Sequence, residues 1–333
     1  MLTRRQFITT MALASFGGCR ALTGVKSPVA GPQSCCWDDE VRPTTIAIVG
    51  DVQRTGFLEM TTLGRSQNDR EREAVLNAIA ADQPDMLLML GDQVVLGDDE
   101  ENWVYFDRIM APIRDVGVPV RAMLGNHDYE GRNTSVCIRS FCQRFPHQRD
   151  VMHGLTLLGP IALITLDSNF DRLTRSEIDD QVAQYRKWLA KLDADPDVKG
   201  VIVASHHPPY TNSALSAGKD LKDVRDTFAG PFTDAVKTRL YLSGHVHSYE
   251  RFLAGEKMFV VSGGGGGPRR EVDNSPNRPY HNDAYRKDGF RPFHYLRLKI
   301  HEEKLTVETR MLRKRGSDWD FASGDRFALG FAG

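Results

Sequence analysis

The sequence predicts an α/β fold in which strands buried on both faces alternate with helices. Five stretches share one pattern, a continuous apolar run followed by glycine or serine and then a polar residue. They are TTIAIVGDVQ (44–53), DMLLMLGDQ (85–93), VPVRAMLGNHD (118–128), GVIVASHHPP (200–209) and RLYLSGHVH (239–247). Apolar runs without alternation are typical of strands covered on both faces, so we expect a largely parallel sheet with helices packed against it.

Helical periodicity lies between these runs. It is clearest over 174–192, which follows the capping box Thr174-x-x-Glu177, and it is also present over 69–81 and 102–115. These three segments are predicted to be helices.

Near the C-terminus, the stretches 293–301 and 305–312 alternate strictly between apolar and polar residues about a polar turn. This alternation predicts an antiparallel hairpin with one wetter face. No internal repeat and no linker follow residue 44, so we expect residues 44–333 to form a single domain.

The chain is long enough to bury a full core, since 41% of its 333 residues are hydrophobic. Its 43 Lys and Arg against 44 Asp and Glu give a formal net charge of −1. This balance provides no basic surface that would recruit nucleic acid or an anionic membrane as a whole.

The N-terminus is similar to a bacterial export signal. Arg4 and Arg5 precede a short apolar stretch, Phe7 to Phe16, which matches the twin-arginine type. We expect residues 1–19 to be this signal, with a lipobox ending at Cys19, and residues 20–43 to be a disordered tether. The protein is then exported, either as a lipoprotein attached to the membrane through Cys19 or, after cleavage near SPVAG, as a soluble periplasmic protein. An amphipathic first helix is the alternative.

The remaining cysteines follow no zinc-site spacing. Cys137 and Cys142, expected in a loop, could form a disulfide in an oxidising compartment. Cys35 and Cys36 lie in the tether.

Each of the five apolar runs ends in a polar side chain. These are Asp51, Asp92, Asn126, His206 and His245. Taken alone, each is typical of a turn, a helix cap or a hydrogen-bonded histidine. In open α/β sheets, however, ligands bind beyond the carboxyl ends of the strands, so together these residues predict a site at one sheet edge.

The ordered motifs Gly-Asp, Gly-Asp, Gly-Asn-His-Asp, His-His-Pro-Pro and Gly-His-x-His resemble those of the calcineurin-like metallophosphoesterases. GNHD and GHVHSYER are most similar to the purple acid phosphatase branch. The resemblance covers residues 44–311. It implies a four-layer αββα sandwich of two mixed sheets, with two metal ions at the sheet edge.

The resemblance also implies a role for each motif residue. Asp51 and His247 would hold one ion, Asn126, His206 and His245 the other, and Asp92 would bridge them. Oxygen and imidazole ligands without thiolate suit Fe, Mn or Zn. His127 would stabilise the phosphoryl group or protonate the leaving group, while Asp128 and His207 would support the ligands.

Two positions depart from the family pattern. Gln53 stands where most of the family has histidine, and we expect it to ligate the first ion directly or through water, or else to support the ligands. Val95 replaces the tyrosine of the purple branch, so the charge-transfer colour should be absent.

Two further features bear on the site. Five glycines in VVSGGGGGP (260–268) resemble the segment of purple phosphatases that packs against the metals; a flexible loop is the alternative. The long segments 129–153 and 268–292 carry arginines that could clamp an anionic group or lie on the solvated surface: Arg132, Arg139, Arg144, Arg149, Arg269, Arg270, Arg278, Arg286 and Arg291.

The sequence therefore predicts a binuclear-metal phosphohydrolase in which a metal-bridging hydroxide attacks a small phosphate ester, with a monoester as the first choice. A phosphodiesterase or pyrophosphatase acting on nucleotides or lipid head groups is the alternative. A non-catalytic metal-binding surface protein is the rival of another class.

Overall fold

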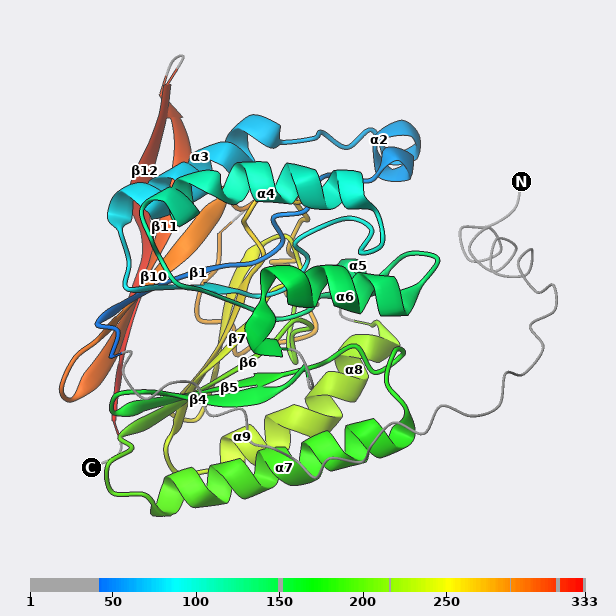
Figure 1. Cartoon of the computed structure of the whole chain (residues 1–333). Coiled ribbons are helices and arrows are strands. Elements are labelled where there is room, and N and C mark those ends of the chain that lie inside the picture. The colour runs from blue at the N-terminus through cyan, green and yellow to red at the C-terminus, as the bar shows by residue number, and fades with distance from the viewer. Residues whose placement is uncertain (1–41, 149–151, 216, 288, 316–317, 332–333) are drawn as a thin grey trace, which may run out of the picture. The chain divides into compact units, whose positions relative to one another are not determined.

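Two six-stranded sheets form the centre of the computed structural model, which describes residues 42–148, 152–215, 217–287, 289–315 and 318–331. Helices cover the outer face of each sheet, as Figure 1 shows for α3 and α4 on one side and α7 and α9 on the other. The four-layer αββα sandwich expected from the sequence is confirmed.

The first sheet has the strand order β12-β11-β10-β1-β2-β3. Its strands are β1 (Thr45–Val49), β2 (Met86–Met89), β3 (Val120–Ala122), β10 (His294–Ile300), β11 (Lys304–Arg315) and β12 (Asp318–Gly330). β1, β2 and β3 run parallel, whereas β10, β11 and β12 pair antiparallel. The expected C-terminal hairpin is thus present, and β12 extends it by a further strand.

The second sheet has the order β4-β5-β6-β7-β9-β8. Its strands are β4 (Gly154–Leu158), β5 (Ile161–Leu166), β6 (Gly200–Ser205), β7 (Thr238–Ser243), β8 (Tyr249–Ala254) and β9 (Lys257–Ser262). The four central strands are parallel and the two edge strands antiparallel. Both sheets are therefore mixed.

The helices follow the apolar periodicity of the sequence. They are α2 (Phe57–Leu63), α3 (Asp69–Asp82), α4 (Glu100–Asp115), α5 (Asn126–Tyr129), α6 (Thr134–Arg144), α7 (Arg175–Ala194), α8 (Lys219–Val224) and α9 (Gly230–Asp234). A 3₁₀ turn, η1 (Pro146–Gln148), follows α6, and a π-helical turn, η2 (Arg225–Ala229), joins α8 to α9. The three predicted helices are confirmed as α3, α4 and α7, and Thr174 and Glu177 form the predicted capping box of α7.

Three apolar layers hold the sandwich together. Alternate residues of the strands, such as Ile48 and Leu88 in one sheet and Ile202 and Leu242 in the other, form the core between the sheets. The opposite faces pack against α3, α4 and α6 on one side and against α7 and the segment from α8 to α9 on the other. Because both faces of each central strand are buried, their sequences are continuously apolar.

The placement of Cys137 and Cys142 corrects one expectation. They lie on α6 rather than in a loop, and no disulfide joins them to each other. Five positions along a helix rotate a side chain by about 140°, so the two sulfurs point apart. Cys137 Sγ donates to the Glu130 carbonyl and Cys142 Sγ to the Gln148 carbonyl.

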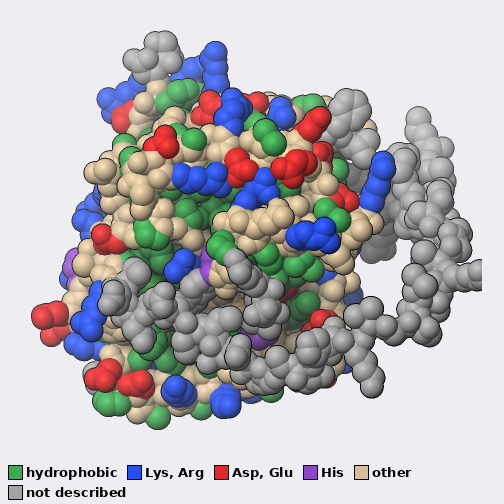
Figure 2. Space-filling model, in the orientation of Figure 1, with side chains coloured by type: hydrophobic (Ala, Val, Ile, Leu, Met, Phe, Trp, Pro, Cys, Tyr) green, Lys and Arg blue, Asp and Glu red, His purple; other side chains and the backbone are tan. Residues whose placement is uncertain are grey.

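The expectations for residues 1–41, including Cys19, Cys35 and Cys36, lie outside the described residues. Among the helices that the structure describes, none has the length and hydropathy needed to cross a membrane. On the face seen in Figure 2, basic and acidic side chains are interspersed, in keeping with the near-zero net charge.

Candidate metal centre

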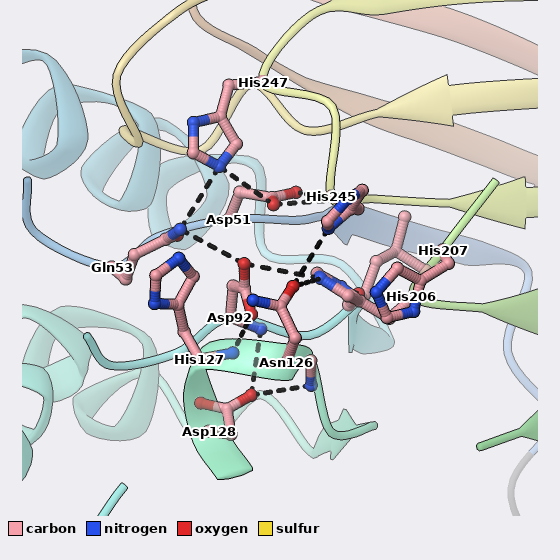
Figure 3. Close-up of polar contacts among 12 residues, drawn as sticks. Asp51, Gln53, Asp92, Asn126, His127, Asp128, His206, His207, His245 and His247 are labelled. Atoms are coloured by element: carbon pink, nitrogen blue, oxygen red, sulfur yellow. Dashed lines mark hydrogen bonds and ion pairs between the residues drawn. The ribbon is translucent and has the colours of Figure 1, made fainter. Parts of the chain in front are cut away.

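The polar residues that end the apolar strands meet at one edge of the two sheets (Figure 3). Asp51 follows β1, Asp92 follows β2 and Asn126 follows β3, while His206 follows β6 and His245 follows β7. The first sheet thus supplies the carboxylates and amides, and the second sheet supplies the imidazoles. The gathering expected from the motif order is present.

One group of donors lies around Asp51 and His247. His247 Nε2 is 3.3 Å from Asp51 Oδ1, and Gln53 Nε2 is 3.2 Å from both His247 Nε2 and Asp92 Oδ2. Gln53 is buried, and its Oε1 has no hydrogen-bond partner among the residues that the structure describes. Because the amide oxygen and nitrogen exchange places by a half-turn of the side chain, the unpartnered oxygen can face the same point as the other donors. This arrangement suits a cation.

A second group of donors lies around Asn126. Its Oδ1 is 3.2 Å from His206 Nε2 and 2.9 Å from His245 Nδ1. Asp92 Oδ2 is 3.4 Å from His206 Nε2, so this carboxylate lies between the two groups. The donors fit two divalent ions of the kind that oxygen and imidazole ligands prefer, with Asp92 shared between them.

Backbone carbonyls orient two of the imidazoles. His206 Nδ1 is 2.8 Å from the Leu90 carbonyl oxygen, and His247 Nδ1 is 2.9 Å from that of Pro268. A carbonyl can only accept, so each Nδ1 carries the proton and each Nε2 faces the site as a donor atom for a metal.

Three of these residues have left-handed backbone conformations. The φ angles are 62° at Asp51, 56° at Asp92 and 65° at His245. Such conformations cost about 1 kcal/mol or more for a residue with a side chain, so surrounding contacts must hold them. One such contact joins the sheets, because the His245 backbone N–H donates to Asp51 Oδ1 at 2.9 Å.

Asp128 ties two of the motifs together. Its fully buried carboxylate accepts backbone N–H groups of Asp92, Gln93 and Gly125 at 2.8–2.9 Å. Burial, with the nearby charge of Asp92, raises the Asp128 pKa to about 7, although hydrogen bonds from Gly125 and Val94 oppose the shift. Asp128 therefore fixes the position of the carboxylate shared by the two groups.

Neighbouring charges in the site shift one another's pKa values. Burial would raise the pKa of Asp92, but the charges of His206 and His127 outweigh it and hold that pKa well below its usual range. Burial likewise opposes charge on His206, yet Asp92 and Asp51 raise its pKa to about 9. The pKa of His207 is lowered to about 3 by burial and by the charge of His206. A bound metal must displace the His206 proton.

His127 lies beside the donors rather than among them. Its backbone N–H donates to Asp92 Oδ1 at 2.9 Å, and its Nδ1 is 3.2 Å from both the Val95 carbonyl oxygen and Glu130 Oε2. Burial opposes its charge, but Asp92 and Glu130 raise the pKa of His127 to about 10. The side chain can therefore carry a proton at neutral pH, as an acid or a phosphoryl-stabilising group requires.

The glycine run 263–267 is a buried wall of the site, not an exposed loop. A Cβ on Gly263 would lie 2.3 Å from the Val246 carbonyl oxygen and 2.7 Å from Asp51 Oδ2, and one on Gly267 would lie 2.8 Å from His247 Cε1. Only glycine lets the backbone approach the donor residues this closely.

A cavity of about 700 Å³ opens beside Asn126 and His245. Its charged wall residues include Arg172, Arg175 and Lys219, none of which the sequence reasoning selected. Lys219 begins α8, whereas Arg172 and Arg175 follow β5. The β5 run IALITL (161–166) ends directly in Asp-Ser-Asn, so like the five recognised runs it stops at a polar residue, although no glycine or serine comes between. That pattern was the available signal.

Two arginines of the long segments have structural partners. Arg144 packs over Trp103 and pairs with Asp107 at 2.8 Å, and Arg278 forms a buried pair with Asp283 at 2.8 Å. The described arginines of these segments are absent from the cavity wall. Arg149 lies outside the described residues.

The family profile for calcineurin-like phosphoesterases matches residues 44–249, which include all seven donor residues. The chain belongs to the calcineurin-like phosphoesterase family. The predicted family and enzyme class, a metal-dependent phosphoric ester hydrolase, are confirmed at this level.

Relatives of this phosphoesterase include two kinds of protein. It is 27% identical over 192 residues to "Probable cyclic nucleotide phosphodiesterase syc0937_d" of Synechococcus, covering 57% of this chain and 68% of that protein. It is 24% identical over 225 residues to purple acid phosphatase 23 of Arabidopsis thaliana, covering 63% of this chain and 48% of that protein.

Among solved structures, purple acid phosphatase PPD1 from yellow lupin aligns with a TM-score of 0.62 at 17% identity, covering 90% of this chain and 55% of that one. The likeness shows a shared fold. The phosphoesterase spans about half the length of the two plant phosphatases.

The motif GHVHSYER (244–251) also contains a residue that stabilises the fold. Glu250, fully buried, accepts Thr211 Oγ1–H at 2.5 Å and the Asn212 backbone N–H at 2.7 Å, and so ties this motif to the loop after His206. Burial raises the Glu250 pKa to about 7, although hydrogen bonds from Thr211 and Asn212 oppose the shift.

Glu250 should make stability depend on pH. Between its ordinary pKa of 4.5 and about 7, the folded carboxyl keeps a proton that the unfolded one has lost. Its contribution is thus present below pH 4.5 and is lost as the pH rises through about 7, a change of up to about 3 kcal/mol. In Glu250→Gln, the free energy of unfolding, measured with urea between pH 4.5 and 8, should no longer show this fall with rising pH. Glu256→Gln, exposed in the same hairpin, should keep it; equal slopes in both variants would contradict the assignment.

Proposed function

We propose that this protein uses two divalent metal ions to hydrolyse small phosphate esters, and that phosphomonoesters are its preferred substrates. The observation that supports the proposal most directly is the position of Asp92 between two groups of nitrogen and oxygen donors. When bound, two ions supply Lewis acidity toward the phosphoryl oxygens and lower the pKa of water in the site.

The chain's own residues supply the rest of the chemistry. Asp51, Gln53, Asp92 and His247 would hold one ion, and Asn126, His206, His245 and Asp92 the other. His127, held by Asp92 and Glu130, would give a proton to the departing alkoxide as the P–O ester bond breaks and water adds to phosphorus. The products are an alcohol and inorganic phosphate.

A phosphodiesterase is the second candidate, because one relative carries the name of a cyclic nucleotide phosphodiesterase. Protein loaded with Mn²⁺, Zn²⁺ or Fe²⁺ should be assayed on p-nitrophenyl phosphate, on its bis ester and on pyrophosphate. We expect the monoester to react fastest and a chelator to abolish the rate. A faster rate on the bis ester would favour the phosphodiesterase, and no turnover on any substrate would favour a non-catalytic metal-binding protein.

We also propose that the protein acts outside the cytoplasm, attached to a membrane through lipidated Cys19. The support is the sequence of residues 1–19, with its Arg4-Arg5 pair and apolar stretch. Labelling cells with a radioactive fatty acid should mark the wild-type protein and not Cys19→Ser. Labelling of neither would leave the alternative, a cleaved soluble form.

A further inference from the structure

The imidazole of His245 uses its two ring nitrogens differently from those of His206 and His247. Its Nδ1 faces the donor group, 2.9 Å from Asn126 Oδ1, so its Nε2 points away toward the cavity. There it faces the carboxylate of Asp220 on α8, whose Oδ2 is 3.7 Å from His245 Nε2. The outer nitrogen of this histidine therefore faces a carboxylate, whereas backbone carbonyls lie within hydrogen-bond distance of the outer nitrogens of the other two.

His207 contributes a second imidazole to the same carboxylate. Its Nε2 is 3.8 Å from Asp220 Oδ2, and its ring lies 4.3 Å from the ring of His245 between centroids. Ser168 Oγ accepts the His207 backbone N–H at 3.0 Å and lies 2.9 Å from His207 Nδ1. The serine hydroxyl can donate to Nδ1, which leaves the His207 proton on Nε2, toward Asp220.

We propose that Asp220 is a positioning residue for the second metal ion: it accepts the Nε2–H of His245 and so holds the imidazole with Nδ1 toward the ion. His207, fixed by Ser168, holds Asp220 in place from the other side. The inference rests on the two-ion site of the proposed function.

A carboxylate is suited to this role. An imidazole that donates its outer N–H to a carboxylate is oriented and is made a stronger base toward the metal. The 3.7 Å separation is slightly longer than a hydrogen bond, and the side chain of Asp220 is 48% exposed, so a small rotation of this side chain can bring its oxygen within hydrogen-bond distance of His245.

The test is the binding of each ion to full-length protein, measured by isothermal titration with Mn²⁺ or Zn²⁺ and by metal analysis after dialysis. In Asp220→Asn we expect the second ion to bind about 10- to 100-fold more weakly, while the first ion keeps its wild-type affinity. Asp220→Glu should recover part of the loss. These readouts do not depend on turnover, so failure of the hydrolase proposal and failure of this inference are separate outcomes.

Asp223→Asn is the matched control. Asp223 lies on the same helix, lines the same cavity and pairs with Lys219, so the variant removes the same charge without touching His245. It should bind both ions as wild type does. Equal weakening in both variants would show a general effect of charge and would overturn the inference.

A double-mutant cycle assigns the effect to His245. In a chain that carries His245→Ala, Asp220→Asn should cause no further loss of second-ion affinity, because the imidazole through which it acts is gone. Full additivity of the two losses would contradict the inference. So would unchanged second-ion binding with a raised KM, which would place Asp220 on the substrate instead.

Discussion

Asp92→Asn should lower the rate of phosphoester hydrolysis by about a thousandfold or more, which corresponds to about 4 kcal/mol of activation free energy. Asp92 Oδ2 is 3.4 Å from His206 Nε2 and 3.2 Å from Gln53 Nε2, so its charge serves both donor groups. Asparagine keeps the shape and removes the charge. The bound metal should fall from two ions per chain to one, as measured by metal analysis alongside turnover.

The control for this variant is Glu101→Gln, which neutralises an exposed carboxylate on α4. It should leave turnover and metal content unchanged. An Asp92→Asn protein that retains two ions and the full rate would show that the shared position is assigned to the wrong residue.

Gly263→Ala should damage both folding and metal binding. The added methyl would lie 2.3 Å from the Val246 carbonyl oxygen and 2.7 Å from Asp51 Oδ2. To make room for it, the backbone at Val246 or the carboxylate of Asp51 would have to move. Overpacking of this kind costs about 1–3 kcal/mol and occasionally more. We expect a loss of about 3 kcal/mol in the free energy of unfolding, measured with urea, together with loss of the first ion.

Gly230→Ala provides the comparison for this second variant. Gly230 is the first residue of α9, and beyond its own helix a Cβ there would meet no atom of the described residues within 4 Å. Alanine at this helical position should leave metal binding unchanged and leave stability equal or slightly raised. If Gly263→Ala had the same free energy of unfolding and the same metal affinity as Gly230→Ala, the glycine run would not be the tightly packed wall described.

The donor residues could be predicted because their signal is local. A buried strand that stops at glycine and a polar side chain, as before Asp51 or Asp92, places that side chain at the sheet edge whatever surrounds it. The assignment of these residues as metal ligands came from the family resemblance.

Other features depend on contacts between distant parts of the chain. Asp220 and Arg172 reach the cavity only because α8 and the segment after β5 fold beside it, and neither lies in a recognised motif. Helix α6 has its own signals, an Asn133 cap and buried Cys137 and Phe141. The sequence reasoning treated this segment as an insertion and so missed them.

The division of donors between the sheets has a consequence for the order of folding. Asp51, Asp92 and Asn126 belong to the first sheet and His206, His245 and His247 to the second, so neither half of the chain contains a complete set. In the proposed two-ion site, high affinity would develop only after the sheets have docked, because an ion would gain its full coordination only across the boundary between them. Metal uptake would then be a late step that stabilises the assembled sandwich.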